Sequence, residues 1–345
     1  MTLFCYFSSL AQSSPHYVYD RILAISDKEA ASTSDIAAYI KNTFPDETDK
    51  VRAAYIWVVH NIEYDTDSMY AINWNMGGSL KITESLRRRK GVCENFAGIF
   101  TDIVTKAGLT ASTIDGYTKQ ANFINRTGHT WSAVLVRDGW YLFDPTWDKD
   151  RKEDYNYFML PPSGLSKTHI PFDPLWQFSD SPVSHREFQG KGESKSERFP
   201  NHLDSVKAFM RLSELDKLEA TARRMDQSDN ISDLLKNRKA FLQMKIATVY
   251  EERDMNLYNA AVRDVNAATE AYNKYNHKTS AIVDIVTASD RYILILEPAL
   301  DSLNSALDKI AGIGKYMPNY QYDPASLRVR ILEISEKIRW AKPVL

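Results

Sequence analysis

The chain has 345 residues, more than one hydrophobic core usually serves, so two domains are expected. Its formal net charge is −2, and no cluster of basic residues forms a groove for phosphates, which excludes nucleic acid as an expected partner. No uninterrupted apolar run reaches ~18 residues, so no transmembrane span is expected.

Residues 1–11 are interpreted as a truncated signal peptide. The segment is apolar and ends on Ser9-Leu10-Ala11, which is typical of a cleavage site, although no basic residues lead it. Cleavage after Ala11 would remove Cys5 and leave Cys93 as the remaining cysteine, which suits an oxidising compartment. We therefore expect a periplasmic or secreted protein, with a cytoplasmic location as the alternative.

Two helices are predicted over residues 34–44 and 46–62. Apolar residues of the second recur at helical spacing, and this pattern predicts a face that packs against the helix that carries Cys93. The polar and aromatic segment 65–78 follows and ends in Gly77-Gly78, so it is expected to be a loop on the substrate side.

Cys93 is the most informative residue, because it stands in Gly91-Val92-Cys93-Glu94-Asn95 at the expected start of a helix. The first turn of a helix has free N–H groups and partial positive charge, which stabilise a thiolate. The apolar residues that follow have core spacing up to Gly108, which is typical of a helix end.

The basic run Arg87-Arg88-Arg89-Lys90 has two interpretations. Cations at the negative end of a helix are the favoured one. A positive field that stabilises the Cys93 thiolate is the other, and both are compatible.

A hairpin is predicted from two strands, residues 130–136 and 140–144, joined by Arg137-Asp138-Gly139. His129 precedes the first strand and Asp144 ends the second, so the pairing brings the two side chains close. An imidazole can take the proton of a thiol, and a carboxylate can hold that imidazole in one tautomer. Cys93, His129 and Asp144 are therefore the candidate catalytic triad.

The same residues resemble the transglutaminase-like superfamily of papain-type thiol enzymes, in its bacterial secreted type. The resemblance covers about residues 46–160, and several motifs in the right order are more specific than any one of them. The matching motifs are Trp57, Asn61-Ile62-Glu63-Tyr64-Asp65, Arg89-Lys90-Gly91-Val92-Cys93, Ala107-Gly108-Leu109, Asp115-Gly116-Tyr117, Gly128-His129-Thr130-Trp131 and Asp144-Pro145-Thr146-Trp147-Asp148.

The oxyanion of the tetrahedral intermediate needs hydrogen-bond donors, and the backbone N–H of Cys93 is one candidate. The resemblance implies a second donor upstream of the cysteine. Trp74, Asn75 and Trp131 are the candidates for this donor or for the substrate cleft, and simple packing is the competing explanation for Trp74.

The expected fold class is α+β. A papain- or transglutaminase-like core, with the thiol helix against an antiparallel sheet of residues 112–118 and the hairpin, is followed by an all-α helical bundle domain. The expected domains are an enzyme domain over 12–190, a linker over 191–204 and the bundle over 205–345. The aromatic and proline-rich stretch 169–177 is expected to be structural, because one His with one Asp is a poor set of metal ligands.

Four helices are predicted in the second domain, over 206–225, 231–275, 289–313 and 325–340. Leucines and alanines recur three or four residues apart, and the charges alternate in sign, as in a solvated antiparallel bundle. The bundle has no catalytic constellation and is a candidate docking surface for a protein partner.

The leading hypothesis is a peptidase or amidase in which Cys93 attacks a carboxamide or peptide carbonyl and water resolves the thioester. The expected substrate is a protein or peptide, for which a cell-envelope peptide is one candidate. One alternative is a cross-linking transglutaminase that uses a lysine amine. The other is a catalytically inactive papain-like module that binds peptide, with the bundle as its docking arm. No metal or organic cofactor is expected.

Overall fold

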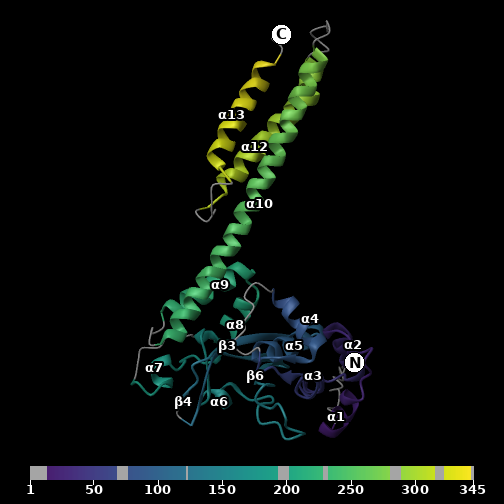
Figure 1. Ribbon diagram of the computed structural model, residues 1–345, viewed down its shortest axis with the longest axis vertical. Helices are drawn as coiled ribbons and strands as arrows, with labels where there is room; N and C mark the ends of the chain where they lie inside the picture. Colours follow the sequence, from purple (N-terminus) through teal and green to yellow (C-terminus); the bar gives the residue numbers. More distant parts are fainter. Residues whose placement is uncertain are drawn as a thin grey trace, which may run out of the picture. The chain divides into compact units, whose positions relative to one another are not determined.

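The computed structural model describes residues 14–67, 77–121, 123–192, 202–227, 232–279, 289–314 and 322–342. The chain divides into two compact units, residues 1–239 and 240–345. The elements of the first unit, drawn in Figure 1, are α1 (Pro15–Leu23), α2 (Thr33–Thr43), α3 (Glu47–Asn61), β1 (Glu63–Tyr64), α4 (Gly78–Arg88), β2 (Lys90–Gly91), α5 (Cys93–Lys106), β3 (Thr110–Gln120), β4 (Phe123–Ile124), β5 (His129–Val136), β6 (Gly139–Phe143), α6 (Pro162–Leu165), β7 (His169–Pro171), the 3-10 helix η1 (Pro174–Gln177), α7 (His185–Phe188), α8 (His202–Met210) and α9 (Glu214–Asp226).

Five strands form the antiparallel sheet of the first unit, in the order β4-β3-β5-β6, with β7 also paired to β3. The predicted hairpin is present as β5 and β6, and Val136 lies opposite Gly139. Arg137 in the turn adopts the left-handed region (φ 54°), which the tight connection requires. The central strand β3 is longer than the predicted 112–118, because its far end also pairs with β4 and β7.

Both faces of this sheet are covered. On one face, Val134, Val136 and Phe143 share a core with α2, α3 and α5. On the other, Trp131, Ala133 and other strand residues pack with η1, α8 and α9. Helix α5 contacts β3, β5 and α3, so the thiol helix lies against the sheet, as the predicted α+β fold requires. The fold prediction is therefore confirmed.

Helix starts explain why these segments fold locally as they do. Asp46 caps α3 by accepting hydrogen bonds from the N–H groups of Thr48 (2.8 Å) and Asp49 (3.3 Å). The predicted single helix over 206–225 is wrong, because Ser213 caps a new helix there and accepts from the N–H of Asp216 at 3.2 Å. The segment is two helices, α8 and α9.

The second unit is helical. Its elements are the greater part of α10 (Asp233–Thr279), the π-helical segment η2 (Tyr292–Leu296), α12 (Glu297–Ala311) and α13 (Pro324–Trp340). Ala261, Leu303 and Ile331, one residue from each of the three helices, belong to a common buried core. The large all-α region predicted at the C-terminal end is confirmed.

Three expectations about chain organisation stay predictions. The proposed signal segment 1–11 and most of the proposed linker 191–204 lie outside the described residues. The expected enzyme domain over 12–190 and helical domain over 205–345 also stay predictions. In the described part of the chain, no helix combines the length and the apolar character needed to cross a bilayer.

Candidate active site

Cys93 is the first residue of α5 and is partly exposed. Its helix begins without a capping side chain at Val92; instead the Asn95 Oδ1 accepts a hydrogen bond from the Val92 N–H at 2.9 Å. A methyl group at Gly91 would lie 2.5 Å from the Asn95 Cβ, so glycine is needed there. Among the described residues, no acceptor pairs with the N–H of Cys93, which leaves this donor available to an oxyanion.

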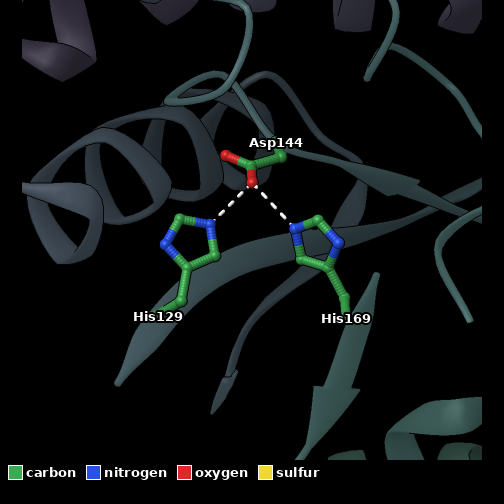
Figure 2. Close-up of side chains that lie close together, drawn as sticks. All are labelled: His129, Asp144 and His169. Atoms are coloured by element: carbon green, nitrogen blue, oxygen red, sulfur yellow. Dashed lines mark hydrogen bonds and ion pairs between the residues drawn. The ribbon is translucent and has the colours of Figure 1, made fainter. Parts of the chain in front are cut away.

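His129 opens β5, opposite Gly116 of β3. Its Nε2 lies 2.6 Å from Oδ2 of Asp144, which directly follows β6. The two side chains are buried, with 8% of His129 and none of Asp144 exposed. Figure 2 shows the ring of His129 with its nitrogen directed at this carboxylate oxygen. The structure therefore brings two of the three predicted triad residues into a short, charge-assisted hydrogen bond.

The turn after Asp144 fixes its carboxylate. Oδ1 accepts from the N–H groups of Thr146 (3.0 Å) and Trp147 (3.2 Å). Further along, the buried Asp148 accepts from the Tyr55 hydroxyl at 2.6 Å, and the same hydroxyl lies 3.0 Å from the backbone oxygen of Asp144. The second aspartate of the Asp144–Asp148 motif thus anchors the turn that presents the first.

His169 also reaches this carboxylate, which the sequence analysis missed. Its Nε2 lies 3.1 Å from the same Asp144 Oδ2, from the opposite side (Figure 2). The stretch 169–177 was expected to be structural, and its Asp173 is indeed a helix cap. No motif or periodicity indicated His169, because a strand of three residues places it there.

The electrostatics follow from these contacts. Burial alone would lower the pKa of His129, but the charge and hydrogen bond of Asp144, with a hydrogen bond to Cys93, raise it to about 10. Burial would raise the pKa of Asp144, but the charge and hydrogen bond of His129, with the hydrogen bond from His169, hold it well below its usual value. Burial lowers the pKa of His169 more than Asp144 raises it. These shifts favour a protonated His129, an ionised Asp144 and a neutral His169.

Cys93 lies close enough to His129 to contribute to the raised pKa of that imidazole. Because Asp144 occupies Nε2 of the ring, Nδ1 is the nitrogen left for the thiol. The three residues are therefore candidates for proton transfer from the thiol.

Aromatic rings enclose the two histidines. Trp131 stacks on His129, with ring centroids 6.2 Å apart and planes at 22°, and meets His169 edge on at 5.1 Å. Trp147 lies 4.4 Å from the ring of His169. This wall excludes water from the hydrogen bonds to Asp144 and strengthens them.

Of the remaining predicted site residues, Trp131 contacts the cluster through the rings of His129 and His169. Trp74 and Asn75 lie outside the described residues. Trp131 is only 1% exposed and supports the imidazoles from behind, so its place in a substrate cleft stays a prediction.

The basic run next to Cys93 is largely paired. Arg88 and Lys90 both contact the buried Asp65, at 3.0 and 3.2 Å. Lys90 also contacts Asp67. These carboxylates reduce the positive field that the run could exert on the thiol, which favours the interpretation as a helix end, and α4 does end at Arg88.

His129, Asp144 and His169 are also the donor types of a metal site, and one ligand atom of each lies within 4.8 Å of the others. Donors that share a tetrahedral zinc ion at bond lengths of ~2.0–2.1 Å stand roughly 3.3 Å apart. The 2.6 Å separation of His129 and Asp144 is instead that of a hydrogen bond. The cluster is therefore assigned as hydrogen-bonded.

Comparison with known proteins identifies the region that contains these residues. Residues 34–145 match the family model described as "Transglutaminase-like superfamily". Kyphoscoliosis peptidase of Mus musculus is 30% identical over 167 residues, which is 44% of this chain and 25% of the relative. Kyphoscoliosis peptidase of Homo sapiens is 31% identical over the same length, with the same shares. The chain thus spans about a quarter of these curated relatives.

Two solved structures are also similar. A proposed cysteine protease from Cytophaga hutchinsonii has 20% identity and a TM-score of 0.25, over 46% of this chain and 40% of that chain. A TGase has 16% identity and a TM-score of 0.30, over 65% of this chain and 55% of that chain. Residues 34–145, which contain Cys93, His129 and Asp144, thus match the transglutaminase-like superfamily.

Proposed function

We propose that the protein is a cysteine peptidase or amidase that cleaves protein or peptide carbonyls through a thioester on Cys93. The observation that carries the proposal is the buried 2.6 Å hydrogen bond between His129 and Asp144, and the contribution of Cys93 to the raised pKa of the same imidazole supports it. An intact set of three residues argues against the inactive peptide-binding module, for which loss of one member would be the signature.

Acylation starts with the proton of the Cys93 thiol already on His129, because the raised pKa of that imidazole favours its protonated form. The thiolate attacks the substrate carbonyl carbon, and the resulting oxyanion accepts a hydrogen bond from the Cys93 N–H at the start of α5. His129 then donates the proton to the leaving amine as the carbon–nitrogen bond breaks. The products of this half-reaction are a thioester and a free amine.

Deacylation reverses the roles of the same residues. His129, now neutral, takes a proton from water, and the hydroxide formed attacks the thioester carbonyl. The carbon–sulfur bond breaks, the acid product leaves, and the proton taken from water stays on His129 beside the released thiolate. Asp144 keeps its charge throughout and stabilises the imidazolium in both halves.

Water is the proposed acceptor. Transfer to an amine needs a second binding site that excludes water, and nothing among the described residues visibly builds one. The name of the curated relatives, Kyphoscoliosis peptidase, supports the same choice. A peptide of the cell envelope remains one candidate substrate, and export remains a proposal that rests on residues 1–11.

The test is the rate of Cys93 alkylation by iodoacetamide against pH, with labelling located by mass spectrometry. Cys5→Ser is the background, so that Cys93 is the one thiol. We expect rapid labelling well below the ordinary thiol pKa of ~8.5, and loss of this phase in His129→Ala. His60→Ala is the matched control, because His60 lies in α3, bonded to Tyr155 at 2.8 Å.

An ordinary thiol profile in the parent protein, unchanged by His129→Ala, would contradict the enzyme and favour the binding module. The acceptor is then tested with a glutamine-containing peptide in ¹⁸O water with a fluorescent primary amine present. We expect ¹⁸O in the acid product. Incorporation of the amine in its place would make the protein a cross-linking transglutaminase.

A further inference from the structure

We propose that His169 is a positioning residue of the thiol site: as a neutral imidazole it donates a hydrogen bond to Asp144 and holds the carboxylate in line with His129. The inference rests on the proposed function and extends the Cys93–His129–Asp144 set by a fourth member. His169 is not a catalytic residue in this role, because it acts through Asp144.

The backbone of His169 is placed by the central strand β3. In register, Thr118 lies opposite His169, and Gly116 lies opposite Pro171 on one side and His129 on the other. The strands that carry the two histidines, β5 and β7, therefore pair with opposite edges of β3. A methyl group on Gly116 would lie 2.2 Å from the backbone oxygen of Ile170, so this glycine permits the approach of β7.

The direction of the hydrogen bonds follows from the acceptor. An ionised carboxylate only accepts, so the Nε2 atoms of both His129 and His169 must carry hydrogens. They donate to the same Asp144 oxygen at 2.6 and 3.1 Å. Two protonated nitrogens thus converge on one oxygen of Asp144, as Figure 2 shows.

The other nitrogen of His169 settles its charge. Nδ1 lies 2.9 Å from the Thr168 hydroxyl, and a neutral ring that carries its hydrogen on Nε2 accepts there. The same hydroxyl also lies 3.3 Å from the Leu165 oxygen, which accepts from the Thr168 N–H at 2.9 Å; its hydrogen goes to Nδ1, the closer of its two acceptors. Burial, which lowers the pKa of His169, favours the same neutral state. The tautomer with its hydrogen on Nε2 satisfies both hydrogen bonds of the ring.

The ring of His169 is held by its surroundings as well. Only 3% of the residue is exposed, and it packs between Trp147 and Trp131 at centroid distances of 4.4 and 5.1 Å. A buried ring with two hydrogen bonds and two aromatic neighbours has little freedom. The ring can therefore hold Oδ2 of Asp144 in one position through its hydrogen bond.

The consequence for Asp144 is that each carboxylate oxygen has a fixed donor. Oδ1 is held by Thr146 and Trp147, and Oδ2 by His169, in addition to the reacting His129. Without His169, only the two N–H groups on Oδ1 and the reacting His129 itself would resist rotation about the last side-chain bond of Asp144. Because the fourth donor is neutral, it adds no positive charge that would compete with the imidazolium of His129.

The primary measurement is the ¹⁵N–¹H spectrum of the full chain labelled with ¹⁵N-histidine. In the parent we expect a downfield, slowly exchanging proton on His129 Nε2, and a neutral His169 with its hydrogen on Nε2. In His169→Phe, which keeps a ring but removes the donor, we expect the His129 signal to broaden or vanish. In His169→Gln, whose amide can replace the donor, it should persist.

The second measurement is Cys93 alkylation at about pH 6, which needs no substrate. Removing an outer hydrogen-bond partner commonly costs ~10- to 100-fold, so we expect the labelling rate of His169→Phe to fall about tenfold and His169→Gln to recover most of it. The matched control is His185→Phe. His185 is also a buried histidine, 5% exposed and stacked on Tyr117, and its loss should leave both readouts unchanged.

The outcomes separate this inference from the proposed function. If the parent thiol is unreactive, the function fails, and the His129 signal alone decides the role of His169. An unchanged signal in His169→Phe overturns the inference, as does a signal lost equally in His169→Phe and His169→Gln. If His169→Phe does not fold, Thr168→Val replaces it; we then expect His169 to populate both tautomers, and a single unchanged tautomer overturns the inference.

Discussion

Each unit contains a carboxylate with no exposed surface, Asp144 in the first and Asp254 in the second. Asp254 pairs with the Arg253 guanidinium at 2.8 Å and accepts from the Gly314 N–H at 2.9 Å. These partners keep their hydrogens at any physiological pH. Asp144 instead meets two histidines, whose protons can move. Complete burial alone thus does not mark a reactive carboxylate; the partners do.

The rest of the buried polar groups follow the same division. Among the described residues, the second unit has Asp254 and Ser335 as its buried polar side chains, whereas most of the remaining ones lie near the sheet and helices of the first unit. Apolar packing therefore explains most of the core of the helical unit. In the first unit, the protonation states and hydrogen-bond partners of the buried polar side chains matter as well.

The largest effect is expected from Asp144→Asn. A neutral amide does not stabilise the imidazolium of His129, and its N–H can favour the wrong tautomer of the ring. In serine proteases the equivalent change lowers kcat by roughly 10⁴-fold. We expect hydrolysis to fall by ~10³- to 10⁴-fold with substrate affinity little changed, measured as kcat and KM. Asp254→Asn is the comparison, and an equal loss of kcat there would remove the distinction between the two carboxylates.

The same pair predicts a pH dependence of stability. The pKa of His129 is raised from 6.5 to about 10, so its stabilisation is complete below pH 6.5 and is lost as pH rises through about 10. The lowered pKa of Asp144 gives stabilisation that is present above 3.8 and lost as the pH falls towards the lowered value. The difference in unfolding free energy between parent and Asp144→Asn should peak between these limits and shrink towards pH 10, at about 1.4 kcal/mol per pKa unit. Urea unfolding at several pH values measures it, and a difference that grows between pH 6.5 and about 10 contradicts the assignment.

Gly116→Ala is expected to destabilise the first unit by about 3 kcal/mol, because backbone atoms of β7 must move to admit the methyl group. Gly78→Ala is the matched control: nothing lies within 4 Å of its added Cβ, and it begins α4. Urea unfolding followed by tryptophan fluorescence compares the two. Equal stabilities would mean that β7 does not approach β3 as closely as described.

The smallest effects are expected in the second unit. Asp254→Asn should cost about 1–3 kcal/mol through weakened hydrogen bonds, seen as faster amide exchange in α10 and α12, with Cys93 alkylation unchanged. Leu294→Ala, at a side chain that is 80% exposed, should change stability by less than about 0.5 kcal/mol. Slower alkylation in either variant would show that the helical unit influences the thiol site.

Much of the first unit could be predicted, because its signals are local. Acidic residues at the start of α3, the hairpin residues between β5 and β6, and apolar spacing in α5 each depend on a few neighbours in sequence. The hairpin register in turn predicted that His129 and Asp144 would meet. The break between α8 and α9 was missed, although Ser213 and Asp216 have the spacing of a helix start.

His169 could not be predicted, because its position depends on tertiary pairing. Its strand has three residues and pairs with the far end of β3, more than fifty residues earlier in the chain. A segment that short has no period to detect, and its prolines favoured a structural interpretation. The role of the Asp148 carboxylate was equally hidden, because its partner Tyr55 comes from α3.

The position of β3 between the strands of the two histidines also bears on the order of synthesis. During translation, Cys93, His129 and Asp144 all leave the ribosome before the residues of β7. Strand β5 can therefore pair with β3 before β7 does. The last hydrogen bond to Asp144 forms only when β7 docks. A nascent or truncated chain that ends before His169 would therefore lack the hydrogen bond from His169 to Asp144.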